Sequence, residues 1–335
     1  QWYRMGRAQN LDEFKDAMRI HALAMFNTGY GDRDGNIFYA YNALLPERAD
    51  GHDWSGTVPG NTRDTLWTEY RPFDELPIVE NPKSGFIQNC NSDPFQTTIG
   101  GDNPDESAFS ENYGIEKWMT NRARRAVELY GGDDSINHDE FFRYKYDKTY
   151  SEKSELRMQV ANFLDAQPES NKLKKELELL RQWNGEMTKD NRSAALVLLT
   201  FRPRSNSSKR KTGHERTLEQ LQKASEDLRK HFGRIDVEWS KVNRLVRGDK
   251  NLPLGGGPDT LRAIYGRPQE DGTLAGVAGD CFFQFVEWDK DGNLRAWAIN
   301  QFGGNPGNPD SPHYSDQASM FAEEKLRKVP FTREE

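Results

Sequence analysis

The sequence predicts an α+β protein in which strand patterns lie towards both ends of the chain and helix patterns fill the middle. Residues 30–42 and 281–299 each alternate like paired strands around an Asp-Gly turn, which supplies the positive φ angles of a tight hairpin. Between about 139 and 247, apolar residues recur three or four positions apart with charged residues between them, a pattern typical of amphipathic helices. These observations predict a β-rich part at 1–112, a helical region at 113–250 and C-terminal strands at 251–335.

Composition limits the classes of function. The chain has 335 residues, of which 35% are hydrophobic and 30% charged, and its formal net charge is -7. This length can bury a sizeable core and hold about two domains. The negative charge argues against a nucleic-acid partner, because binding a phosphate backbone needs a basic face. No apolar run approaches membrane-spanning length, so we expect no membrane partner.

The N-terminal part is expected to hold one helix, one hairpin and long loops. Residues 10–27 read as an amphipathic helix with Asn10 as its cap. The sequence Asp32-Arg33-Asp34-Gly35-Asn36 has some calcium-loop character, but it lacks the closing Glu, so a hairpin turn is favoured. Residues 43–84 are rich in Pro, Gly and Trp without a sustained period, which is typical of ordered loops that line a pocket.

The middle region is expected to be built from four helices and a linker. Three segments have clear helical periodicity: 156–163, 173–183 and 218–232. Residues 194–201 form a continuous apolar run that predicts a buried helix, although its period also allows a strand. Residues 203–213 are rich in Ser and Lys and read as a linker.

A candidate functional stretch is Gly85–Pro94, with the sequence GFIQNCNSDP. The alternation at 86–89 suggests a half-buried strand, which Pro94 would end and which would leave Asn91 at a rim. An Asn side chain offers two N–H donors without charge, and this suits the stabilisation of a transient oxyanion. In the alternative interpretation, Asn89 and Asn91 only satisfy backbone groups of the turn.

A second candidate lies at the start of a predicted helix at 118–129, where Thr120 or Asn121 could act near the first turn. Arg122, Arg124 and Arg125 fall within one helical turn. From the residues alone, an exposed basic face is the favoured explanation of this cluster.

Several segments in their order and spacing resemble the β-subunit of the penicillin acylase family of N-terminal-nucleophile hydrolases, most nearly its acylhomoserine lactone and aculeacin acylase branch. They run from about residue 28 to the C-terminus and comprise YGDRDGNIFYAYN at 30–42, NPKSG at 81–85, NCN at 89–91, LGGGPDTL at 254–261, GGNPGNPDSPHYSDQ at 303–317 and VPFT at 329–332. Each segment is weak alone, and the combination is specific.

The resemblance implies part of an αββα sandwich with a largely helical middle region. It also implies an amidohydrolase that releases an acyl group from an amine such as a homoserine lactone, β-lactam or lipopeptide. In this family the nucleophile is the first residue of the β-subunit, exposed by self-cleavage, and its own α-amine, with a pKa near 8, serves as the base. Asn91 would then donate to the oxyanion, and Arg122, with Arg125 as the fallback, would orient Asn91.

The resemblance also implies partners, because the chain begins with Gln1-Trp2-Tyr3 rather than Ser, Thr or Cys. We therefore expect it to be the C-terminal part of the β-subunit of a longer precursor, with an α-subunit and the nucleophile-bearing start of the β-subunit as missing partners. The substrate would be a small acylated amide, and the location periplasmic or secreted. The alternative is a non-catalytic fragment or binding module that retains the scaffold.

We expect no cofactor and no metal site. The chain has two Cys residues, Cys90 and Cys281, which are too few for a zinc cluster, and a single bridge between them stays open. The six His residues show no ligand-like spacing. His313 has no acid partner at a spacing that supports a Ser-His-Asp triad, so it is not a candidate.

Overall fold

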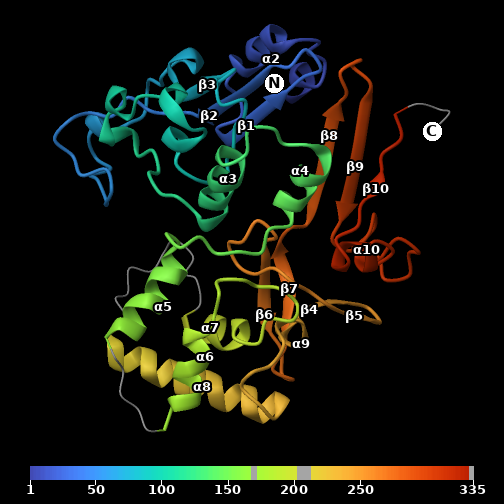
Figure 1. Ribbon diagram of the computed structural model, residues 1–335. Helices are drawn as coiled ribbons and strands as arrows, with labels where there is room; N and C mark the ends of the chain where they lie inside the picture. The colour runs from blue at the N-terminus through green and yellow to red at the C-terminus, as the bar shows by residue number, and fades with distance from the viewer. Residues whose placement is uncertain (167–171, 202–212, 332–335) are drawn as a thin grey trace. The chain divides into compact units, whose positions relative to one another are not determined.

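The computed structural model describes residues 1–166, 172–201 and 213–331 of the chain (Figure 1). Contacts group the chain into two compact units. The first comprises Gln1–Asp134 with Trp288–Asn293, and the second comprises Ser135–Glu287 with Leu294–Glu335. The three-part division expected from the sequence follows the type of secondary structure, and it stays a prediction.

The first unit is built on a three-stranded antiparallel sheet in the order β1-β2-β3. Its strands are β1 (Met25–Gly31), β2 (Ile37–Ala43) and β3 (Ile78–Glu80). Gly35, at φ 89°, turns the chain between β1 and β2, so the predicted hairpin is confirmed. The helices of this unit are α1 (Trp2–Met5), α2 (Leu11–Met18) and α3 (Asn121–Gly131).

The predicted helix at 10–27 is correct only in its first half. Asn10 caps α2 as expected, because its side chain accepts a hydrogen bond from the backbone N–H of Glu13 at 2.9 Å. The helix ends after Met18, and the chain turns at His21, whose φ is 55°. Residues 19–24 form a turn and an irregular segment, and 25–27 join β1, where pairing with β2 satisfies the backbone and overrides the apolar periodicity.

The core of the first unit lies between α2 and β2. Phe14 and Met18 of α2 are buried in one cluster with Phe38 of β2. The ring of Phe14 also lies 4.7 Å, centroid to centroid, from the ring of Tyr30 in β1. These contacts fix the central strand of the sheet as a rigid element.

The prediction of a strand at 86–89 is wrong. These residues lie in none of the strands of the described chain, and Gln88 is tied down instead by a single backbone bond from its N–H to the carbonyl of Thr97 at 2.8 Å. The Gln88 side chain donates to the carbonyl of Gln96, also at 2.8 Å. The segment is therefore held by local loop contacts, in which Gln88 is buried and the residues on either side of it are half-buried.

The second unit contains the helical region. Its helices are α4 (His138–Lys145), α5 (Glu155–Asp165), α6 (Lys174–Arg181), α7 (Ala194–Phe201), α8 (His214–Phe232), α9 (Trp239–Val242) and α10 (Ala318–Ala322). The segments predicted as helices match α5, α6 and α8. The predicted linker at 203–213 lies outside the described residues except for Gly213.

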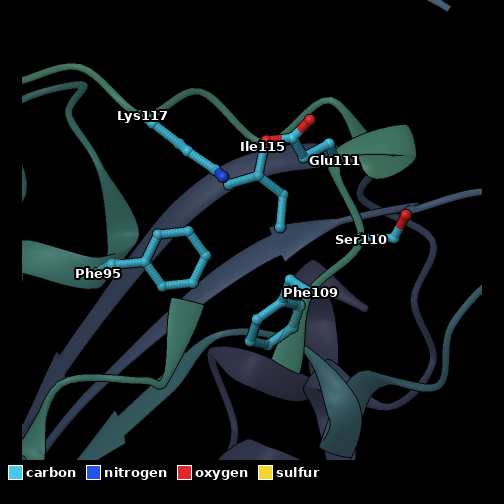
Figure 2. Close-up of a pocket in the computed structure, with 6 residues that line it drawn as sticks. All are labelled: Phe95, Phe109, Ser110, Glu111, Ile115 and Lys117. Carbon is cyan, nitrogen blue, oxygen red and sulfur yellow. The ribbon is translucent and has the colours of Figure 1, made fainter. Parts of the chain in front are cut away.

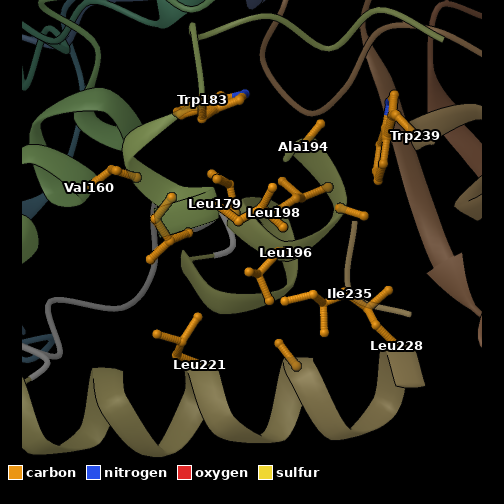
Figure 3. Packing of buried hydrophobic residues seen from close by; sticks show 14 of the residues in the cluster. Val160, Leu179, Trp183, Ala194, Leu196, Leu198, Leu221, Leu228, Ile235 and Trp239 are labelled. Atoms are coloured by element: carbon orange, nitrogen blue, oxygen red, sulfur yellow. The ribbon is translucent and has the colours of Figure 1, made fainter. Parts of the chain in front are cut away.

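The apolar run at 194–201 is the helix α7, which settles the alternative between a helix and a strand. Ala194, Ala195, Leu196 and Val197 are fully buried, and Leu221 and Leu228 of α8 point at α7 from one side (Figure 3). A helix that is apolar all round is stable in water only when neighbouring elements enclose it. Here α5, α6 and α8 enclose α7.

Two further sheets complete the second unit. One has the order β5-β4-β7-β6, and the other has the order β10-β9-β8. The strands are β4 (Asn243–Arg247), β5 (Lys250–Pro253), β6 (Ile264–Pro268), β7 (Leu274–Gly279), β8 (Phe282–Trp288), β9 (Leu294–Asn300) and β10 (Arg327–Lys328). The adjacent strands β8 and β9 confirm the hairpin predicted at 281–299.

The glycine-rich segment at 254–261 wraps around a buried arginine. Gly256 has φ 81°, and a Cβ there would lie 2.2 Å from the carbonyl oxygen of Arg262, so only glycine fits. Arg262 is 1% exposed and bonds the Asp280 carboxylate at 3.0 Å and the Phe321 carbonyl at 2.6 Å. The charge is tolerated in the interior because it is paired.

Candidate active site

Asn91 lies at the tip of a turn that another asparagine holds. The φ angle of Asn91 is 56°, in the left-handed region that Asn tolerates better than most residues. Its backbone N–H donates to the Oδ1 of Asn89 at 2.9 Å. The Nδ2 of Asn89 donates to the carbonyl of Ser92 at 3.2 Å and closes the turn. Asn91 itself is exposed, as expected for a residue at a rim.

Helix α3 begins beside this turn because of Thr120. The Thr120 hydroxyl accepts a hydrogen bond from the N–H of Ala123 at 3.0 Å, which makes it the helix cap. The same hydroxyl donates to the carbonyl of Cys90 at 3.2 Å. A backbone bond from Asp93 N–H to the Trp118 carbonyl, at 2.9 Å, joins the two segments a second time.

The two predicted site residues meet in a direct hydrogen bond. The guanidinium Nη2 of Arg122 donates to the Oδ1 of Asn91 at 3.2 Å. Arginine carries only donors, so the Asn91 atom that faces it must be the oxygen. The Asn91 Nδ2, with its two N–H donors, therefore points away from Arg122 and is the end that can meet an oxyanion.

Each of the two interpretations fits one of the two asparagines, Asn89 and Asn91. Asn89 satisfies backbone groups of the turn, as the alternative proposed. The side chain of Asn91 instead bonds a side chain from α3. Arg125, the fallback arginine, pairs with Glu128 at 2.8 Å along its own helix. The catalytic roles of Asn91 and Arg122 stay predictions, and their contact is an observation.

A cavity of about 250 Å³ opens in the same unit, close in sequence to the Asn91 turn (Figure 2). The rings of Phe95 and Phe109 and the side chain of Ile115 form its apolar lining. Lys117 lies at its rim with its Nζ 2.8 Å from a carboxylate oxygen of Glu106, and this hydrogen bond raises the pKa of Lys117. The cavity can hold an apolar group under a charged rim.

The two Asp-Gly turns are closed by carboxylates. Oδ1 of Asp32 accepts the N–H groups of Asp34 at 3.0 Å and Asn36 at 2.9 Å. Asp289 makes the equivalent pair of bonds in the second hairpin. The prediction of turns at these sites is confirmed. Across residues 1–166, 172–201 and 213–331, no group of three or more His, Cys, Asp or Glu side chains is arranged to hold a metal ion.

The structure also locates two other sequence candidates. Cys90 and Cys281 belong to different compact units, and a bridge between them stays an open alternative. His313 pairs with an acid three residues along the chain, because its Nδ1 lies 2.9 Å from Oδ2 of Asp316. The His313 side chain is 67% exposed, which gives no buried triad geometry. Within the part of the chain that the structure describes, no helix is long and apolar enough to cross a membrane.

Sequence reasoning missed Tyr39. Its hydroxyl accepts a hydrogen bond from the Asn89 Nδ2 at 3.3 Å, across 50 positions of sequence. Tyr39 reads in the sequence as one apolar position of a strand. A signal for its role would have required knowing that β2 and the Asn91 turn are neighbours.

Comparisons with known proteins agree with this fold. A sequence model of the penicillin amidase family matches residues 1–335. Penicillin G acylase from Escherichia coli is 38% identical over 93 residues, 28% of this chain and 11% of that protein. Acyl-homoserine lactone acylase PvdQ from Pseudomonas fluorescens is 31% identical over 104 residues, 29% of this chain and 13% of that protein. The matched segments thus span only a small part of these relatives.

A solved structure covers far more of the chain. The thermostable penicillin G acylase from Alcaligenes faecalis aligns with 99% of this chain and 69% of its own, at a TM-score of 0.59 and 18% identity. The α+β fold is therefore that of the N-terminal-nucleophile hydrolases, as the resemblance implied. The chain belongs to the penicillin amidase family. The relatives that it matches are named as acylases.

Proposed function

We propose that the chain supplies the oxyanion-stabilising part of an acylase active site. Asn91 is the donor, and Arg122 is the residue that orients it. The observation that carries the proposal is the bond from the Arg122 guanidinium to the Asn91 Oδ1, at 3.2 Å. It holds the amide oxygen on one side and presents two N–H donors on the other.

In the proposed reaction, a nucleophile attacks the carbonyl carbon of a linear amide. The carbonyl oxygen gains negative charge, and the Asn91 Nδ2 donates a hydrogen bond to it. Because Arg122 is positively charged, it also lowers the electrostatic cost of that charge. The nucleophile's own α-amine takes up its proton and passes it to the leaving amine as the amide C–N bond breaks. Water then cleaves the bond between the acyl group and the nucleophile, and the acyl group leaves as a carboxylic acid.

We assign the nucleophile to an N-terminal Ser, Thr or Cys outside these 335 residues, on the β-subunit start that the resemblance implies. An α-subunit would complete the heterodimer, and export to the periplasm or out of the cell is part of the proposal. Asn91 and Arg122 support this division of labour, because an amide and a guanidinium stabilise charge but do not attack a carbonyl.

The proposed substrates are acylated amines of the kinds named for the relatives, penicillin G and acyl-homoserine lactones. The test uses the protein produced from its complete reading frame and measures the primary amine released from both. Wild-type protein should release amine, and Asn91→Gly should lower kcat by about 100- to 1000-fold. Arg124→Ala is the matched control, on the same helix as Arg122, and should stay within about twofold of wild type.

Gly is the correct replacement because Asn91 has φ 56°, which glycine adopts freely and alanine does not. A protein that hydrolyses neither substrate would favour the alternative, a non-catalytic module on the same scaffold. Hydrolysis that survives Asn91→Gly would refute the assignment of the donor.

A further inference from the structure

We propose that Asn89 and Tyr39 are positioning residues for Asn91, and that a hydrogen-bonded relay from the central strand of the sheet holds the donor in place. The inference rests on the proposed function, because it explains how that function's donor is oriented. It starts from the conformation of Asn91, which lies outside the common regions of φ and ψ.

Hydrogen bonds hold both the side chain and the backbone of Asn91. Its side chain bonds Arg122, and its backbone N–H bonds the Oδ1 of Asn89. Asn enters the left-handed region more readily than most residues, but that region is still less favoured than the common ones, so the bonds around the turn stabilise a φ of 56°. If the backbone bond were lost, Asn91 would relax towards the common regions of φ and ψ, and its side chain would swing away from the present position.

Asn89 uses its whole side chain for this task. Its Oδ1 accepts from Asn91 N–H at 2.9 Å, and its Nδ2 donates to the Ser92 carbonyl at 3.2 Å and to the Tyr39 hydroxyl at 3.3 Å. Because these three hydrogen bonds point in different directions, they fix the orientation of the Asn89 side-chain amide. An apolar side chain of the same size at position 89 could make none of them.

Tyr39 anchors Asn89 to the core. It lies in β2, the central strand, where it is 1% exposed and pairs in register with Gly29 and Val79. Burial raises the pKa of Tyr39 above its ordinary value, so the hydroxyl stays protonated. That hydroxyl donates to the Oδ1 of Asn27 at 2.7 Å, so its oxygen is the acceptor for the Asn89 Nδ2, and it also makes a side-chain hydrogen bond with Thr97.

The relay therefore runs from Asn27 through Tyr39 and Asn89 to the backbone of Asn91. Each hydroxyl or amide in it has a donor and an acceptor role fixed by its neighbour. A site built on such a rigid strand holds its donor more precisely than a loop alone, and a misplacement of about 1 Å can cost about 100-fold in rate.

The experiment uses the full-length protein with Asn89→Leu and Tyr39→Phe, each measured alone and with Asn91→Gly. Asn89→Leu should lower kcat by about 10- to 100-fold and leave KM within about twofold, because the donor is misplaced while the substrate still binds. In the Asn91→Gly background, Asn89→Leu should lower kcat further by less than about twofold, since there is no donor left to misplace. Tyr39→Phe should act in the same way and more weakly.

Tyr41→Phe is the matched control, because Tyr41 is a half-buried tyrosine two positions along the same strand. It should leave kcat unchanged. A crystal structure of the Asn89→Leu protein gives a readout independent of activity, and it should show Asn91 outside the left-handed region or separated from Arg122.

Equal effects of Asn89→Leu in the wild-type and Asn91→Gly backgrounds would overturn the proposal. So would a structure of Asn89→Leu in which Asn91 keeps its φ and its bond to Arg122. The failure of the proposed function looks different, because Asn91→Gly would then be as active as wild type, or neither substrate would be cleaved. In that case the structure of Asn89→Leu alone still decides whether Asn89 positions Asn91.

Discussion

Replacing Asn91 with Asp separates the donor role of this residue from its contacts. Asp has the same shape as Asn, tolerates the left-handed region, and keeps the oxygen that accepts from Arg122 at 3.2 Å. The substitution changes only the Nδ2 group, with its two N–H donors, into a negatively charged carboxylate oxygen. Every contact recorded for Asn91 within the described residues is therefore preserved, and the group proposed to meet the oxyanion is removed.

The expected loss follows from that single change. Removing one oxyanion donor raises the barrier by about 2.7 to 4 kcal/mol, which is about 100- to 1000-fold in kcat. A carboxylate near the oxyanion adds repulsion, so Asn91→Asp should be at least as impaired as Asn91→Gly. Stability should change little, because an exposed pair between Asp and Arg122 contributes at most about 1 kcal/mol.

The assay is release of primary amine by the full-length protein, with thermal unfolding of each variant measured in the same buffer. Asn91→Ala is a poorer probe, because alanine at φ 56° costs about 1 kcal/mol of backbone strain. If Asn91 served only to close the turn, Asn91→Asp would be tolerated. A variant that folds like wild type and keeps more than about half of its kcat would therefore refute the reasoning.

Three further predictions concern the rest of the chain. Arg122→Ala should lower kcat by about 10- to 100-fold, because it removes one hydrogen bond from a charged group, and Arg124→Ala should leave kcat unchanged. A larger loss of kcat in Arg124→Ala than in Arg122→Ala would show that the wrong arginine was chosen. Leu196→Ala should lower the free energy of unfolding in urea by about 2 to 5 kcal/mol, since Leu196 is fully buried in α7, and a loss below 1 kcal/mol would contradict the packing described. Burial alone would raise the pKa of Glu176, but hydrogen bonds from Ser225 and a nearby arginine lower it below its ordinary value. The ionised Glu176 carboxylate therefore stabilises the fold at pH values above the ordinary glutamate pKa, and this stabilisation is lost as pH falls below about 4. Glu176→Gln should make the fall of Tm in acid less steep. An unchanged dependence of Tm on pH would contradict this role of Glu176.

The sequence predicted elements well where local signals and burial agree. Helix α7 was read from an unbroken apolar run, and the cap Asn10 from its chemistry. The hairpins were read from Asp-Gly pairs, whose conformational preference is intrinsic. In each of these places the local preference of the chain and its tertiary environment favour the same structure.

The failures lie where long-range contacts override a local pattern. The apolar positions after Met18 continue a helical period, yet the Gln1 side chain accepts hydrogen bonds from the N–H groups of Ala22 and Leu23, at 2.7 and 3.0 Å. Those bonds come from another segment of the chain and favour the turn into β1. The strand prediction at 86–89 failed for a related reason, because Gln88 hydrogen-bonds Thr97 and Gln96 within a loop and the segment pairs with no strand of the described chain.

The candidate pair itself was predicted only through the resemblance, since an asparagine turn and an arginine-rich helix start each have an ordinary structural explanation. What sequence could not give is the link between them. The Thr120 hydroxyl accepts from Ala123 N–H and donates to the Cys90 carbonyl, so one side chain both starts α3 and holds the turn. Because α3 begins at Thr120, Arg122 falls in its first turn, within reach of Asn91. The register of the helix and the position of the turn are thus set together, and a shift of either would separate the guanidinium from the amide that it orients.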